Sequence, residues 1–246
     1  MARDIAASSN ILFSTDVAAV DITGRFITVF CWINPDSTSG DVGLMTKANY
    51  SSGDVQYVMG FAPSVFFQIG DSGGFDQASA GGSFALPTGI WTSVAGVMNG
   101  NDLLVWRNPG NAVGLATTAR TIQNTGQNFG LGVRNDGGGG QYDGKMAHAA
   151  IWDAALTRDE VMRLHQGWLP PQIRPGNLRA YWPLDGYASS GVARDEWKNG
   201  APLSMNGTVT VLPTQKLAET PQPPGGPVLS GPAFMAAYAT AGFTQI

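Results

Sequence analysis

The sequence of 246 residues has one cysteine, two histidines and few charges. Because Cys31 stands alone, no disulfide can form within the chain, and we expect its stability to come from packing. Charged residues make up 13% of the chain, about half the usual share, and the net charge is −4. No basic cluster occurs, which argues against nucleic acid or an acidic membrane surface as a partner.

Long apolar runs are also lacking. No stretch reaches the roughly 18 apolar residues that a membrane-spanning helix needs. The N-terminus carries Arg3 and Asp4 and has no apolar segment of the kind found in signal peptides. We therefore expect a protein that is made and folded in a cytoplasm. A role outside the cell remains open, since virus particles assemble in the cytoplasm and then leave.

Turn-forming residues, in contrast, are abundant. The 33 Gly and 15 Pro divide the chain into short segments, which is typical of strands joined by turns. Residues 26–33 are apolar on both alternating faces, which predicts a central strand covered on both sides. The predicted strands are 26–33, 55–61, 64–69, 90–98, 102–107, 129–134, 145–153, 178–184 and 208–212.

One short helix is predicted near residues 157–166. Thr157 and Glu160 have the spacing of a capping box, in which each side chain bonds the backbone of the other. Gly167 fits the position just after the helix end, where a left-handed backbone is common. Such a short helix is stable only when it packs on a sheet.

Residues for catalysis are few. A glycosidase needs two carboxyl groups roughly 5 to 9.5 Å apart across the sugar bond. The three glutamates are Glu160 in the helix cap, Glu196, and Glu219 in the proline-rich tail, and no strand alternates acidic residues. His148 and His165 are expected to be structural, and the histidines and cysteine lack any zinc-binding spacing. We therefore predict no catalytic site, no metal ligands of this kind and no enzyme activity.

Several motifs occur in a particular order along the chain. The strand and helix elements of 129–164 form the most specific one, reading strand, strand, then a capped helix after Leu156. The others are FITVFCW at 26–32, GLMTK at 43–47, WTSVA at 91–95 and NLRAYWPLDG at 177–186. Together, from about residue 10 to 212, they resemble the laminin-G-like jelly rolls of concanavalin-A-like proteins.

This resemblance implies an all-β, two-sheet antiparallel jelly-roll sandwich with one short helix. We assign residues 1–212 to the sandwich and 213–246 to a Pro/Gly-rich linker with an apolar C-terminal arm. The arm, residues 233–246, has no charged residue and is expected to bind a partner. Its candidate contact residues are Phe234, Met235, Tyr238, Phe243 and Ile246.

Glycan binding is a function that this fold often hosts. Sugar recognition requires an exposed aromatic platform, and Phe75, Trp106 and Tyr142 are the candidate ligand-binding residues because they lie near loops. Tyr187 is a further platform by the same argument. Most tryptophans are instead expected in the core, namely Trp32, Trp91, Trp152 and Trp182.

Calcium is the one cofactor that the resemblance leaves open, because many related sandwiches bind it at a rim. Oxygen ligands could come from the loops 70–76 and 135–143. The alternative, which we favour, is that their Asp, Asn and Gly residues simply form turns. The acidic residues in question are Asp71, Asp76, Asp136 and Asp143.

Two functions therefore remain open. The first is a non-enzymatic virion surface protein, of the decoration, cement or spike type, displaying its sandwich and anchored by its arm to the subunits of a capsid or tail. In that case the protein would be an oligomer on the surface of a bacteriophage particle. The alternative is a lectin-like, carbohydrate-binding adhesion module, with or without calcium.

Overall fold

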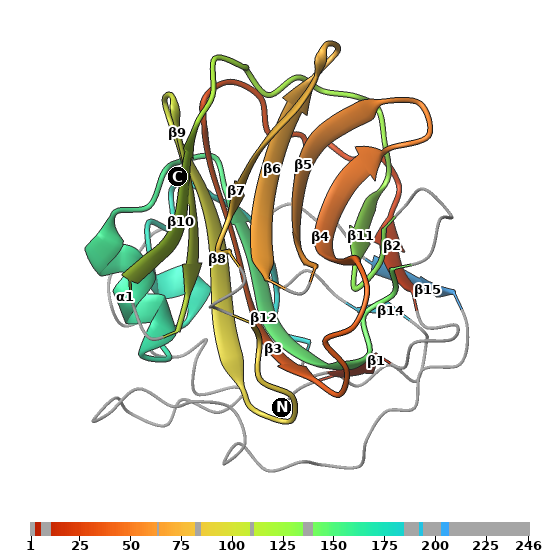
Figure 1. The fold of residues 1–246 in the computed structure, drawn as a ribbon, viewed down its shortest axis with the longest axis vertical. Helices are drawn as coiled ribbons and strands as arrows, with labels where there is room; N and C mark the ends of the chain where they lie inside the picture. The colour runs from red at the N-terminus through yellow and green to blue at the C-terminus, as the bar shows by residue number, and fades with distance from the viewer. Residues whose placement is uncertain are drawn as a thin grey trace, which may run out of the picture.

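The computed structural model describes residues 3–5, 11–62, 64–81, 85–108, 111–134, 140–184, 192–193 and 203–206. The strands of these residues form two antiparallel sheets that face each other (Figure 1). The all-β, two-sheet sandwich predicted from the sequence is confirmed.

Sheet A has seven strands and sheet B has eight among the described residues. In sheet A the order is β1-β12-β3-β8-β9-β10, with β13 also paired to β12. Its strands are β1 (Arg3–Ile5), β3 (Phe26–Pro35), β8 (Thr92–Asn99), β9 (Asp102–Arg107), β10 (Asn111–Thr117), β12 (Gly144–Trp152) and β13 (Leu178–Trp182).

In sheet B the order is β14-β15-β2-β11-β4-β5-β6-β7. Its strands are β2 (Ile11–Ser14), β4 (Val42–Asn49), β5 (Asp54–Phe61), β6 (Val65–Asp71), β7 (Gly74–Ser79), β11 (Phe129–Leu131), β14 (Val192–Ala193) and β15 (Leu203–Asn206). The predicted strand at 208–212 and the linker and arm at 213–246 lie outside the described residues.

The main core lies between the two sheets, and β3 crosses its centre. Val29, Cys31 and Ile33 point into this core, whereas Phe30 and Trp32 belong to a second apolar cluster on the other side of sheet A. Nine of the ten residues of β3 are buried, so the prediction of a strand covered on both faces is confirmed.

Helix α1 (Arg158–His165) covers this second cluster, together with the 3-10 helix η2 (Pro170–Gln172). The predicted capping box is present, since the side chains of Thr157 and Glu160 bond each other's backbone. At the other end Gly167 has a φ of 90°, and the N–H of Gly167 and of Trp168 bond the carbonyls of Leu164 and Arg163. No described helix is long and apolar enough to cross a membrane.

Strand β12 departs from the expected alternation at His148. This residue has a φ of 51° and forms a bulge against β3, where the pairing shifts between Ala147 and Ala150. As a result Met146 faces the main core while Ala150 faces the second cluster. The bulge inserts one extra residue, so Met146 and Ala150 point to opposite faces although they are four positions apart.

The edges of the two sheets meet where β7 approaches β10. A Cβ on Gly114 of β10 would lie 2.4 Å from the carbonyl oxygen of Ser79 in β7. Thr118 Oγ1, just after β10, donates to Asp76 of β7 at 2.6 Å. This side of the sandwich is therefore closed by direct backbone contact.

Candidate functional site

The outer face of sheet B, which points away from the main core, carries the candidate site. In β6 the inward residues Phe67 and Ile69 alternate with Gln68, which therefore faces outward. Gln77 of β7 pairs with Gln68, and Phe75 lies on the same face two positions along. Both Phe75 and Gln77 are exposed, Phe75 to 44%.

Tyr50 joins these residues from the turn between β4 and β5. Its hydroxyl donates to Oε1 of Gln68, and Nε2 of Gln68 donates to Oε1 of Gln77 at 2.7 Å. The rings of Tyr50 and Phe75 meet edge to face, with their centroids 5.9 Å apart. The guanidinium of Arg134 lies 4.3 Å from the centroid of the Tyr50 ring. We call these five residues the Tyr50 patch.

The Tyr50 patch combines the groups that recognise sugars. An exposed aromatic ring offers a flat apolar surface for the C–H face of a sugar. The exposed amide of Gln77, whose Oε1 accepts from Gln68, carries two N–H donors that suit a sugar hydroxyl group. The charge of Arg134 is balanced by an ion pair with Asp41. The patch is therefore polar, aromatic and close to electrically neutral.

The candidate platforms chosen from the sequence differ in their exposure to solvent. Phe75 is exposed and lies in the patch. Trp106 is 6% exposed and Tyr142 is fully buried, with its hydroxyl donating to the carbonyl of Lys145. The expectation that Trp106 and Tyr142 present exposed platforms is wrong. Trp106 packs into the second apolar cluster, and Tyr142 packs into the main core. Tyr187 lies outside the described residues.

Most of the other aromatic residues expected in the core are buried. Trp32, Trp152 and Trp182 are buried as predicted, whereas Trp91 is half-buried. His165, the last residue of α1, is 6% exposed, and its Nδ1 lies 2.5 Å from Oγ of Ser93 in β8. Burial lowers the pKa of His165 to about 4.

The loop carboxylates proposed for calcium have protein partners. Asp71 and Asp76 both form ion pairs with Arg120. Nε of Arg120 lies 3.3 Å from Oδ1 of Asp76. Residues 74–76 also belong to β7 and not to a loop. Among the described residues, no group of three His, Cys, Asp or Glu could hold a metal ion. Asp136 lies outside them, and Asp143 is half-buried.

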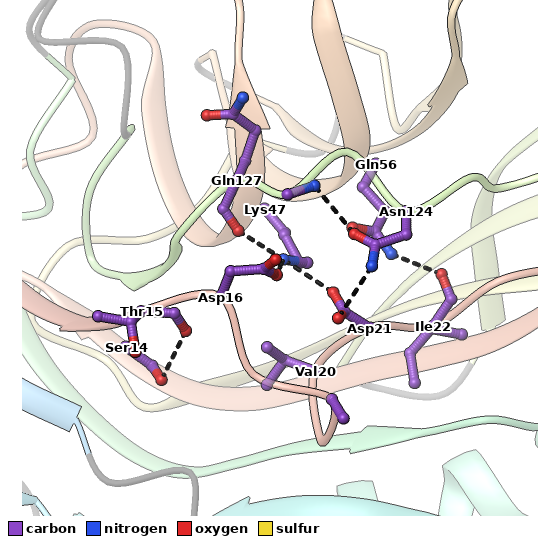
Figure 2. Close-up of polar contacts among 12 residues, drawn as sticks. Ser14, Thr15, Asp16, Val20, Asp21, Ile22, Lys47, Gln56, Asn124 and Gln127 are labelled. Atoms are coloured by element: carbon purple, nitrogen blue, oxygen red, sulfur yellow. Dashed lines mark hydrogen bonds and ion pairs between the residues drawn. The ribbon is translucent and has the colours of Figure 1, made fainter.

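A second polar cluster closes one end of the sandwich and was not predicted from the sequence (Figure 2). Lys47 of β4 points inward and is fully buried. Its Nζ lies 2.6 Å from Oδ1 of Asp16, 2.9 Å from Oδ1 of Asp21 and 2.5 Å from the carbonyl oxygen of Gln127. The hydrogen bond from Lys47 holds the pKa of Asp16 below its usual value. Nδ2 of Asn124 donates to Asp21 at 3.0 Å. We call this group the Lys47 cluster.

The segment between β2 and β3 is held over this end by further bonds. Nε2 of Gln56 donates to the carbonyl of Ile22 at 2.7 Å, and the Tyr57 hydroxyl donates to the carbonyl of Val20 at 2.9 Å. Both donors come from β5, so sheet B and the Lys47 cluster fix the same segment (Figure 2). A lysine in an apolar strand was the only sequence signal for this cluster.

The fold and sequence profile define the class of this protein. The profile of the concanavalin A-like lectin/glucanases superfamily matches residues 8–162. The chain belongs to this family. No curated protein sequence matches the chain.

Solved structures show the same fold. A Bacteroides ovatus protein proposed to bind carbohydrate is similar with a TM-score of 0.65 at 17% identity, over 87% of this chain and 60% of that one. Domain 4 of AbnA, an extracellular arabinanase from Geobacillus stearothermophilus solved with arabinotriose, has a TM-score of 0.53 at 19% identity, over 67% of this chain and 76% of that one. This chain thus spans 60% of the length of the Bacteroides protein.

Proposed function

We propose that this protein is a non-catalytic carbohydrate-binding module that holds its ligand on the Tyr50 patch. The observation that carries the proposal is an exposed ring, Phe75, set edge to face on Tyr50 beside the paired amides of Gln68 and Gln77. Exposed aromatic residues grouped with convergent hydrogen-bonding side chains are typical of ligand sites. The family and its structural neighbours support a lectin-like role.

The carboxylates near the patch favour binding over hydrolysis. A glycosidase requires one protonated acid and one second carboxyl group on either side of the bond that it cleaves. Asp71 and Asp76 are the acidic residues closest to Phe75 along β6 and β7, and both are engaged by Arg120. Glu160 is held in the helix cap and pairs with Arg174 at 2.6 Å.

The experiment is a glycan array probed with the wild-type protein, Phe75→Ala and Leu115→Ala. Leu115 is 69% exposed on β10 of sheet A and serves as the matched control. We expect binding to one group of glycans, an at least tenfold loss in Phe75→Ala, and no change in Leu115→Ala. Wild-type protein that binds no glycan would contradict the proposal, as would a Phe75→Ala variant with full affinity.

The virion role remains a prediction. It rests on the linker and arm at 213–246, which lie outside the described residues, and no comparison bears on it.

A further inference from the structure

The Lys47 cluster and the Tyr50 patch share one hairpin. β4 carries Lys47 and ends at Asn49, the turn carries Tyr50, and β5 begins at Asp54. Lys47 points inward to the end of the core, while the ring of Tyr50 lies on the outer face. The contacts that fix Lys47 therefore also restrain Tyr50, which lies three residues further along the chain in the turn.

Hydrogen bonds connect the cluster to the turn itself. The carbonyl of Gln127 accepts from Lys47, and its side-chain Nε2 donates to Oδ2 of Asp54 at 3.3 Å. Oδ2 of Asp54 also accepts from Oγ of Ser52 at 2.6 Å. Lys47, Gln127, Asp54 and Ser52 thus form a continuous path from the buried ammonium to the turn that bears Tyr50.

The surroundings of Lys47 resemble those of a bound cation. Two carboxylates from one segment, Asp16 and Asp21, and one carbonyl oxygen from a second segment lie within 2.5 to 2.9 Å of its Nζ. Carboxylate and carbonyl oxygens from separate loops are also the ligands that calcium gathers. A buried charge of this kind requires several oppositely charged or polar partners, and here it has them. The ammonium therefore ties segment 15–22 and segment 124–127 to β4.

We propose, on the basis of the proposed function, that the ammonium of Lys47 positions the β4–β5 hairpin, whose turn carries Tyr50, for binding a neutral glycan. The ammonium then has the role that a calcium ion fills in metal-dependent sites. Glycan binding then needs no metal ion. The charges beside the patch support a neutral ligand, because Arg134 pairs with Asp41 and Arg120 with Asp71 and Asp76. These pairs leave little net charge to attract an acidic sugar.

The first test uses wild-type protein on arrays of neutral oligosaccharides (from arabinan, galactan, mannan and xylan) and of acidic oligogalacturonate. Each array is read in EDTA and in millimolar calcium. We expect equal binding to a neutral glycan in both buffers. Binding that requires calcium, or that prefers oligogalacturonate, would overturn this inference but leave the proposed function intact. Binding to no glycan in either buffer would overturn the proposed function.

The second test changes the cation. Lys47→Met should lose at least tenfold in affinity for the array's best neutral glycan in EDTA, and calcium should restore part of that loss by occupying the vacated oxygens. Lys47→Arg keeps the charge and should retain most of the affinity, while Lys145→Met on sheet A is the control and should match wild type.

Full affinity of Lys47→Met in EDTA would overturn the positioning role. If Lys47→Met still unfolds cooperatively but calcium restores none of its lost glycan affinity, the interpretation of the Lys47 cluster as a cation site is wrong. If Lys47→Met does not fold, Lys47→Arg and the wild-type comparison in EDTA decide the question.

Discussion

Arg134 lies over the ring of Tyr50, with Cζ 4.3 Å from the ring centroid, while its Nη1 pairs with Asp41. The guanidinium lies over the face of the ring and so restrains the ring on the outer side of sheet B. Tyr50 is thus restrained from one side by this stack and from the other by its bond to Gln68.

The first prediction concerns this stack. Arg134→Lys keeps the charge opposite Asp41 but loses the planar contact with Tyr50. We expect a several-fold loss of glycan affinity and a loss of about 1 kcal/mol in the free energy of unfolding. Titration calorimetry and urea unfolding measure the two effects. Asp41→Asn, which removes the opposite charge and leaves the stack, should reduce affinity less than Arg134→Lys, and the reverse order would contradict the importance of the stack.

The second prediction separates the ring of Tyr50 from its hydroxyl. In Tyr50→Phe, Oε1 of Gln68 loses its donor, and Gln68 is only 6% exposed. An unsatisfied acceptor in that position costs about 1–2 kcal/mol of stability, which urea unfolding will show. Affinity should fall little, because the ring remains, whereas Tyr50→Ala should lose at least tenfold. Equal affinities of the two variants would show that the ring has no part in binding.

The third prediction concerns the closed side of the sandwich. Gly114→Ala would place a methyl group 2.4 Å from the Ser79 carbonyl and 2.8 Å from Cγ1 of Val105. The strands must move apart, at a cost of about 1–3 kcal/mol. Gly176→Ala is the control, since nothing lies within 4 Å of its Cβ position, and it should be neutral or slightly stabilising. Comparable urea midpoints for the two variants would refute the close approach of β7 and β10.

The fourth prediction concerns pH. Burial lowers the pKa of His165 from 6.5 to about 4 in the folded protein, so the unfolded chain takes up the proton first. His165 therefore costs no stability above pH 6.5, and the folded state loses up to about 3 kcal/mol as the pH falls from 6.5 to 4. Below pH 4 the penalty no longer grows.

The variant for this prediction is His165→Asn, which does not titrate and keeps a polar atom near Oγ of Ser93. Its urea midpoint should vary less than that of wild type between pH 4 and 6.5. Burial also lowers the pKa of His148 to about 4, so wild type and variant share that contribution and the difference curve isolates His165. Parallel curves would contradict the assignment.

Much of the fold follows from local sequence signals. Strands β3, β5, β6, β8, β9 and β12 and helix α1 coincide closely with the predicted segments, because apolar alternation and the Thr157 capping box are strong local patterns. Six of the described strands lie outside the predicted segments and motifs, namely β1, β2, β7, β10, β14 and β15. β7 contains Gly74, Asp76 and Gln77, which have weak strand preference, and is held in place by pairing with β6 and by β10.

The site was less accessible to sequence reasoning. Of the Tyr50 patch only Phe75 was chosen, because its position near a loop indicated exposure, and it is 44% exposed. Tyr50, Gln68, Gln77 and Arg134 come from four separate segments, and only the pairing register of sheet B brings them to one face. Trp106 seemed exposed by its place near a loop, yet the second apolar cluster buries it.

Cys31 is fully buried in the main core, where burial raises the pKa of its thiol, and the chain has no other cysteine. A thiol in that environment reacts slowly with alkylating reagents. A cysteine engineered at an exposed position such as Leu115 would therefore be the one readily modified sulfur. The protein could then be coupled to a chip or a fluorophore at a chosen point on sheet A, with the opposite sheet left facing solution.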